Sequence, residues 1–236
     1  MKKSPLVSVI IPTLNEEKYI ESTLKSVKNQ DYEKYEIIVV DSKSKDSTVR
    51  ICKRYTDKVF VIEKRGVALA RNFGAKNSKG ELLLFLDADT LLLPNTISQL
   101  VKKFRRKNVV GATCMVLPLT TGMDDLLLFL FFNQFVKISL NFKPKIPGLC
   151  CMYRKEVFEK VNGFDEKVKL LEDFDLSERI SNLGEIVIAD KTFVLTSPRR
   201  IEKWGKMNTI RKYTTLYLKY FLSKEKFDLR KYKPIR

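Results

Sequence analysis

Leu82-Leu-Leu-Phe-Leu86 runs directly into Asp87-Ala88-Asp89, and this stretch is the strongest single indication of the fold. Five consecutive apolar residues predict a strand that is buried on both faces, as in a parallel sheet covered by helices. Ligands of such sheets bind beyond the carboxyl ends of the strands. We therefore expect Asp87 and Asp89 at the ligand-binding rim of a parallel sheet.

The sequence before this strand alternates short apolar runs with amphipathic segments. Strands are expected at 7–11, 36–41, 59–62 and 82–86, and helices at 15–27, 46–55, 67–76 and 94–107. This alternation predicts an α/β fold with a mainly parallel, twisted sheet flanked by helices. Asp41 ends the second expected strand, so it should lie at the same rim as Asp87 and Asp89.

The second half of the chain is less regular. Strands are expected at 109–117, 149–153 and 185–189, and helices at 124–142, 172–182 and 201–222. The sequence contains no internal repeat and no clear linker. It therefore predicts one body over residues 1–197 and a C-terminal amphipathic helical extension over 198–236.

The charge is concentrated in that extension. The 236 residues carry 45 basic and 28 acidic side chains, a formal net charge of +17, and 44% of them are hydrophobic, which suffices for a core. Residues 198–236 alone hold 13 Lys/Arg and 3 Asp/Glu. A basic tail of this kind is either a solvated end or a surface for an anionic partner, such as phospholipid or nucleic acid.

Composition excludes several classes of site. There is no histidine, and the four cysteines form no CxxC pattern, so a zinc cluster is excluded and a reduced, cytoplasmic interior is expected. The N-terminus lacks the pattern of an export signal. The longest apolar run, Leu126–Phe132, has seven residues where a membrane-spanning helix needs about 20, so no crossing of a membrane is expected.

Asp87 and Asp89 have the chemistry of a divalent-cation site. Two carboxylates with one small residue between them suit Mg²⁺ or Mn²⁺ shared with a substrate diphosphate, although such a pair is more often a solvated turn. Neither phosphate-binding glycine motif occurs in the sequence, so a diphosphate would need a cation and basic side chains. The candidate donors are Lys64, Arg65, Arg71, Arg199 and Arg200. For Arg71, the alternative is a charge on a helix surface.

Six segments in sequence order resemble the motif series of the family 2 glycosyltransferases. They are Val7–Glu16, Ile38–Thr48, Gly66–Gly74, Leu86–Asp89, Gly163–Glu166 and Glu172–Leu176. The resemblance covers residues 6–200. It implies a GT-A fold, with a nucleotide-sugar-binding half over 1–110 and an acceptor-binding half over 111–197. It also implies an inverting transfer from a nucleotide-diphosphate sugar.

The resemblance implies roles for individual residues. Its nucleotide-sugar-binding residues would be Pro12, Leu14, Glu16, Asp41, Arg71, Asp87, Ala88, Asp89, Arg199 and Arg200. Asp41 would bind the base, and Asp87 and Asp89 would bind the ribose and hold the metal. Leu91 stands where some relatives have another polar ligand, so the metal would be held chiefly by Asp89, the diphosphate and water.

Asp173 resembles the catalytic base of inverting members of the family. Glu172, Asp173 and Asp175 place like charges together near a helix start, and such crowding raises the pKa of a carboxylate. The alternative is an acidic first turn that the helix dipole favours. With the family resemblance, Asp173 is the better assignment.

Two helices bear on partners. Helix 124–142 is almost entirely apolar, with Asn133, Lys137 and Asn141 forming a narrow polar stripe. A core or homodimer helix is favoured for it, and a membrane-facing helix is the alternative. The final helix combines an aromatic and apolar side (Trp204, Met207, Ile210, Tyr217, Phe221) with many basic residues. Such a helix favours peripheral binding to an anionic membrane, and therefore a lipid-linked acceptor such as a polyprenyl phosphate.

The sequence thus predicts a metal-assisted hexosyltransferase that uses a nucleotide-diphosphate sugar and a saccharide or lipid-linked acceptor. The alternatives are a basic nucleic-acid-binding protein and an inactive scaffold of the same fold. No nucleic-acid-binding motif occurs in residues 1–190, so nucleic acid is not expected as a partner.

Overall fold

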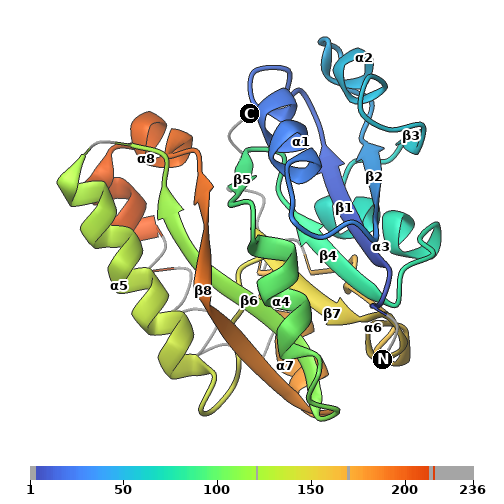
Figure 1. Cartoon of the computed structure of the whole chain (residues 1–236). Coiled ribbons are helices and arrows are strands. Elements are labelled where there is room, and N and C mark those ends of the chain that lie inside the picture. Colours follow the sequence, from blue (N-terminus) through green and yellow to red (C-terminus); the bar gives the residue numbers. More distant parts are fainter. Residues whose placement is uncertain (1–3, 121, 169–170, 213–214, 216–236) are drawn as a thin grey trace.

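The computed structural model describes residues 4–120, 122–168, 171–212 and 215. One eight-stranded sheet, in the order β3-β2-β1-β4-β7-β6-β8-β5, runs through the described part and carries helices on both faces (Figure 1). The α/β class and the helix-flanked sheet expected from the sequence are confirmed.

The first four strands are parallel and end at one rim. They are β1 (Val7–Thr13), β2 (Tyr35–Asp41), β3 (Val59–Val61) and β4 (Leu82–Leu86). Thr13 pairs with Asp41 in the β1–β2 register, so the two side chains lie together at the carboxyl ends. All five residues of β4 are buried, as a continuous apolar run predicts.

The rest of the sheet is mixed in direction. It contains β5 (Thr90–Leu92), β6 (Val109–Pro118), β7 (Cys150–Arg154) and β8 (Glu185–Thr196). Strand β7 lies antiparallel between β4 and β6, whereas β6 and β8 are parallel. The strand expected at 185–189 continues to Thr196. The exposed residues Asp190 and Lys191, where the sequence suggested that the strand ends, lie in an irregularity of the β6–β8 ladder and not in a loop.

Helices α1 to α8 cover this sheet in the described residues. They are α1 (Ile20–Lys28), α2 (Thr48–Cys52), α3 (Val67–Lys76), α4 (Thr96–Lys103), α5 (Met123–Ser139), α6 (Lys155–Lys160), α7 (Glu172–Ser181) and α8 (Arg199–Trp204). Strand β5 and helix α6 were not expected. Both are short, and neither shows a sequence period long enough to be recognised.

The prediction of one continuous helix over 201–222 is wrong, because the helix is interrupted near its start. Helix α8 ends at Trp204 because Gly205 adopts a left-handed φ of 76°. A second helical segment follows over residues 206–212. Tyr217 and Phe221, which were expected on its apolar side, lie outside the described residues.

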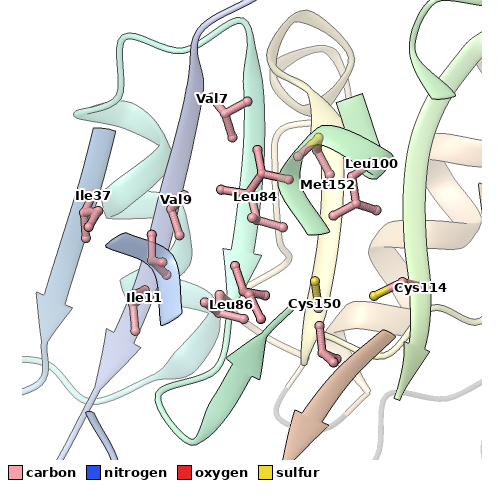
Figure 2. Close-up of a cluster of buried hydrophobic side chains, with 14 of the residues drawn as sticks. Val7, Val9, Ile11, Ile37, Leu84, Leu86, Leu100, Cys114, Cys150 and Met152 are labelled. Atoms are coloured by element: carbon pink, nitrogen blue, oxygen red, sulfur yellow. The ribbon is translucent and has the colours of Figure 1, made fainter. Parts of the chain in front are cut away.

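Alternate side chains of the central strands enter two apolar clusters, one on each face of the sheet. Val7, Val9 and Ile11 of β1 share one cluster with helices α1 and α4, and Figure 2 shows them with Leu84 and Leu86 of β4. The opposite cluster contains residues of α3, α6 and α7. The four cysteines are buried without disulfides, and burial raises the pKa of the Cys52 thiol to about 12.

Helix α5 turns its polar residues differently from the expected pattern. Asn133 is buried, and its side chain accepts from Val116 N at 2.9 Å and donates to Val116 O at 2.7 Å. It therefore satisfies the backbone of β6 as a neighbouring strand would. Lys137 and Asn141 are exposed. None of the helices in the described part of the chain is long and apolar enough to cross a membrane.

Candidate active site

Asp41 lies fully buried at the end of β2. It accepts hydrogen bonds from the Thr13 hydroxyl at 2.8 Å, from Ser44 N at 2.7 Å and from the Ser44 hydroxyl at 2.5 Å. Both carboxylate oxygens therefore fix the turn that follows β2. Contact between Asp41 and a nucleotide base stays a prediction.

Arg199 joins two carboxylates from distant parts of the chain. Its two Nη atoms lie 2.7 and 3.0 Å from the carboxylate oxygens of Glu16, in a bidentate pair. Its Nε lies 2.9 Å from Oδ2 of Asp89. The guanidinium also stacks over Tyr19, 5.1 Å from the ring centroid. The start of α8 is thereby held against the β4–β5 turn and the segment before α1.

The environment of Asp89 favours its protonated form. Burial, together with the negative charges of Asp87 and Glu16, raises the pKa of Asp89 to about 6, although the charges of Arg199 and Arg200 oppose this shift. The pKa of Arg199 is raised, because its contacts with Glu16 and Asp89 outweigh the effect of burial. In this cluster the positive charge of Arg199 is therefore shared by the carboxylates of Glu16 and Asp89.

Arg71 forms a second cluster and is buried, so it is not a helix-surface charge. Its Nη2 lies 2.8 Å from Asp87 Oδ1 and 3.1 Å from the carbonyl oxygen of Gly148. Its Nη1 lies 3.0 Å from Glu172 Oε1. The pKa of Arg71 is raised because Asp87 and Glu172 outweigh the cost of burial. One guanidinium thus joins the end of β4, the loop before β7 and the start of α7.

Asp173 sits beside this cluster in the first turn of α7. Its Oδ2 accepts from Gly148 N at 2.6 Å and its Oδ1 accepts from Phe174 N at 2.9 Å. Burial and the charge of Glu172 raise the pKa of Asp173 to about 7, while Arg71 and the two N–H groups oppose the shift. A half-buried carboxylate that titrates near neutral pH is suited to proton transfer.

Gly148 was not predicted as a site residue, yet its backbone contacts both Asp173 and Arg71. Its N–H donates to Asp173 and its carbonyl accepts from Arg71. A Cβ atom at this position would lie 2.5 Å from Nη2 of Arg71, so a larger residue would displace the guanidinium or the loop from its present position. The preceding Pro147 marks a turn in the sequence. Nothing in the sequence pairs that turn with Arg71 or assigns Glu172 as the other partner.

Left-handed backbone conformations occur next to these side chains. Asn15, Lys43 and Leu171 have φ values of 55°, 65° and 59°, and each lies within two residues of Glu16, Asp41 or Asp173. Such conformations cost free energy in residues other than glycine and concentrate at functional sites. They support the assignment of this rim as the active site.

The remaining predicted residues lie around the two clusters. Leu14 and Ala88 are buried and Pro12 is half-buried, all close in sequence to Glu16 or Asp89. Lys64 and Arg65 are exposed in the segment before α3. The structure thus brings Glu16, Asp89 and Arg199 together, and separately Arg71, Asp87, Glu172 and Asp173, with the 87–89 turn between the two sets.

The donor chemistry of the 87–89 turn fits a hard divalent cation in part. Asp87 and Asp89 offer carboxylate oxygens, which Mg²⁺ and Mn²⁺ prefer. Each carboxylate is paired with a guanidinium, and no group of three or more Asp, Glu, Cys or His side chains among the described residues could hold a metal. A cation here would need further oxygen ligands from a substrate.

The family model described as glycosyl transferase family 2 matches residues 8–161. An uncharacterised glycosyltransferase of Rickettsia typhi is 35% identical over 185 residues, which cover 73% of this chain and 58% of the relative. The probable glycosyltransferase YdaM of Bacillus subtilis is 33% identical over 209 residues, covering 78% of this chain and 48% of YdaM. The chain therefore spans about half the length of these curated relatives.

Solved structures share the fold. The mannosyltransferase PcManGT of Pyrobaculum calidifontis, in complex with GDP-Man and Mn²⁺, superposes with a TM-score of 0.74 at 24% identity, covering 96% of this chain and 67% of that one. S. aureus TarS 1–349 in complex with UDP-GlcNAc superposes with a TM-score of 0.65 at 23% identity, covering 81% and 58%. These likenesses establish the fold.

Proposed function

Because the chain belongs to glycosyl transferase family 2 and has the GT-A fold, we propose that it is an inverting hexosyltransferase that uses a nucleotide-diphosphate sugar. The observation that carries the proposal is the position of Asp173. A carboxyl group with a pKa of about 7 is held beside Arg71, which on its other side is paired with Asp87. The candidate base, Asp173, and the candidate diphosphate site at Asp87 therefore both lie next to the buried guanidinium of Arg71.

The donor is assigned to the rim formed by residues of the first half, 1–110. The nucleotide would lie against Pro12, Leu14 and Ala88, and its base against Asp41. PcManGT with GDP-Man and TarS with UDP-GlcNAc support this class of donor. The sugar and the base follow from the shape of the pocket around the donor, so the proposal names only the class.

Arg199 and Arg200 are the basic side chains assigned to the diphosphate. Arg199 is held at the rim by Glu16 and Asp89, so its charge is already in place before a donor binds. A diphosphate offers the guanidinium a competing bidentate partner. Mg²⁺ or Mn²⁺, held by Asp87 and Asp89, would neutralise part of the negative charge on the leaving diphosphate.

Asp173 is assigned as the general base. Its carboxylate accepts the proton of the acceptor hydroxyl while the acceptor oxygen forms a bond to the anomeric carbon. The bond between that carbon and the diphosphate breaks, and its electron pair leaves with the diphosphate. Attack from the face opposite the leaving group inverts the configuration. An acceptor phosphate would already be anionic and would depend less on Asp173.

The acceptor is assigned to the second half, residues 111–197, and we propose that it is lipid-linked. The excess of basic residues in 198–236 and the exposed apolar side chains of the second half support peripheral association with an anionic membrane. A polyprenyl phosphate or a lipid-linked saccharide fits both features.

Thermal unfolding with UDP, GDP, ADP, CDP and dTDP, with and without Mn²⁺, identifies the nucleotide, because a ligand that binds the folded state raises its stability. Asp173→Asn should keep that shift and lose transfer to a hydroxyl acceptor. Asp175→Asn is the matched control, since Asp175 lies on the same helix and is paired with Arg179 at 2.7 Å. Transfer by Asp173→Asn at the wild-type rate would refute the assigned base.

A further inference from the structure

Helix α5 and the residues just after it expose six large apolar side chains, here called the α5 apolar face, with exposed Gln134 between Phe131 and Ile138. Its members are Met123, Leu127, Leu130, Phe131, Ile138 and Phe142. Phe131 is 76% exposed and Phe142 is 81% exposed. Aromatic side chains in soluble domains rarely remain this open when nothing covers them.

The spacing of these residues places them on one side of the helix. Successive members are separated by three, four or seven positions, or by one position at the centre of the stripe, as on one helical face. The opposite side packs on β6 through buried Asn133 and Val136. Figure 1 shows α5 at the edge of the molecule, on the side away from β1, β2 and β3. The α5 apolar face therefore points away from the body of the sheet.

The helical segment 206–212 lies beside the start of α5 and exposes two further apolar side chains. Lys206 Nζ lies 3.0 Å from Asp124 Oδ2, which fixes the segment beside the first turn of α5. Met207 is 77% exposed and Ile210 is 42% exposed. Two helical segments linked by an exposed ion pair therefore both present apolar side chains.

Exposed basic side chains occur on the same segments as the apolar ones. On α5, the loop after it and residues 199–212, the exposed basic side chains include Lys137, Lys143, Lys203, Lys206, Arg211 and Lys212. Lys143 is paired with Glu178 at 2.9 Å, and Lys212 lies 3.9 Å from the ring centroid of Trp204. The exposed acidic residues of the same segments are Asp124, which is paired with Lys206, and Glu202. An apolar stripe accompanied by exposed basic side chains is complementary to the headgroups and acyl chains of an anionic lipid layer. A second copy of the chain would bring the same positive charges together.

We propose that the α5 apolar face, together with Met207 and Ile210, is the surface by which this protein docks on an anionic lipid bilayer. The inference deepens the membrane association proposed above and assigns it to α5, whereas the sequence favoured the final helix and left a membrane-facing role of 124–142 open. Five residues separate Phe142 from Gly148, whose N–H donates a hydrogen bond to Asp173. Docking along α5 would therefore set the loop that holds the assigned base close to the lipid surface.

Co-sedimentation of the full chain with vesicles tests the proposal. The wild-type protein should bind vesicles that contain phosphatidylglycerol, bind phosphatidylcholine vesicles much less, and lose affinity as salt concentration rises. The double variant Leu127→Ser/Phe131→Ser should bind the anionic vesicles at least about tenfold more weakly, since two apolar side chains no longer enter the lipid. The matched control is Val61→Ser, which changes a 53% exposed apolar residue on β3.

Three outcomes would overturn the proposal. The double variant and Val61→Ser could bind anionic vesicles equally, in which case α5 is not the docking surface. The wild-type protein could bind neither kind of vesicle and elute as a dimer that the double variant dissociates, in which case the face is covered by a second copy. Equal binding to both kinds of vesicle would remove the assigned role of the basic side chains.

Two further measurements separate this inference from the proposed function. The double variant should unfold at the wild-type temperature and keep the shift caused by the nucleotide that binds, because both changed side chains are exposed and distant in sequence from Asp89 and Arg71. A normal nucleotide shift without vesicle binding by the wild type would reject the docking surface alone. Vesicle binding without any nucleotide shift would reject the donor site alone.

Discussion

The carbonyl oxygen of Gly148 lies 3.1 Å from Nη2 of Arg71, and a Cβ atom at Gly148 would lie only 2.5 Å from the same nitrogen. The same guanidinium binds Asp87 and Glu172, and the N–H of Gly148 binds Asp173. The loop before β7 is therefore packed directly between the turn at the end of β4 and the first turn of α7.

Gly148→Ala should displace Arg71 and disturb both carboxylates. A Cβ atom 2.5 Å from a guanidinium nitrogen forces the loop or the arginine to move, and overpacking of this kind costs about 2 kcal/mol in the free energy of unfolding. Urea denaturation and a transfer assay should both show the loss. Gly66→Ala is the control, since its Cβ would meet nothing closer than 3.5 Å. Wild-type stability and activity in Gly148→Ala would contradict the packing described.

Arg71→Lys should destabilise the protein although it keeps the positive charge. One ammonium group cannot reproduce the forked contacts with Asp87, Glu172 and the Gly148 carbonyl, and a buried carboxylate that loses its partner costs about 3 kcal/mol. The expected result is a large fall in the free energy of unfolding, measured by urea denaturation. A variant as stable as the wild type would show that charge alone suffices at this position.

Transfer to a hydroxyl acceptor should rise as pH increases through about 7, because Asp173 accepts a proton only in its ionised form. Glu172→Gln removes the neighbouring negative charge and should move this midpoint to lower pH. The measurement is kcat/KM as a function of pH for both proteins. A midpoint that does not move would separate Glu172 from the titration of Asp173.

The free energy of unfolding should fall as pH rises, because the pKa of Asp89 is higher in the folded protein than in the unfolded chain. Its pKa is raised from 3.8 to about 6, so the folded state binds its proton more tightly than the unfolded state does. The contribution is present below about pH 4 and is lost as pH rises through about 6, with a size of about 2–3 kcal/mol. Denaturation without nucleotide or metal should show this decline in the wild type and a weaker one in Asp89→Asn. An equal decline in both proteins would assign it to other groups.

Arg199→Gln should weaken binding of the nucleotide diphosphate that stabilises the wild type by about tenfold, because one charge-assisted contact to the diphosphate is lost. Isothermal titration of that nucleotide gives the ratio. Arg106→Gln is the control, since Arg106 is paired with Glu185 on an exposed surface. If both variants bind the nucleotide equally well, Arg199 serves only to hold Glu16 and Asp89.

The order and type of most elements could be predicted from the sequence because they follow from local periodicity. The apolar run 82–86 and the alternation around it predicted the parallel strands, and the motif series predicted the family. Strand β5 and helix α6 were too short to be recognised, and the continuation of β8 was hidden by two charged residues that lie in a ladder irregularity. The final helix was predicted too long, since Gly205 interrupts it.

The candidate residues Asp41, Asp87, Asp89 and Asp173 could be named in the sequence because each stands at the end or the start of a predicted element. What only the tertiary structure decided is which charges meet. Arg71 and Glu172 are 101 residues apart, and Glu16 and Arg199 are 183 apart. Their pairing depends on strand order and on how α7 and α8 pack against the rim. Local sequence sets the period of each segment, but the burial that drives these segments together, and with it the pKa of Asp173, is a property of the whole fold.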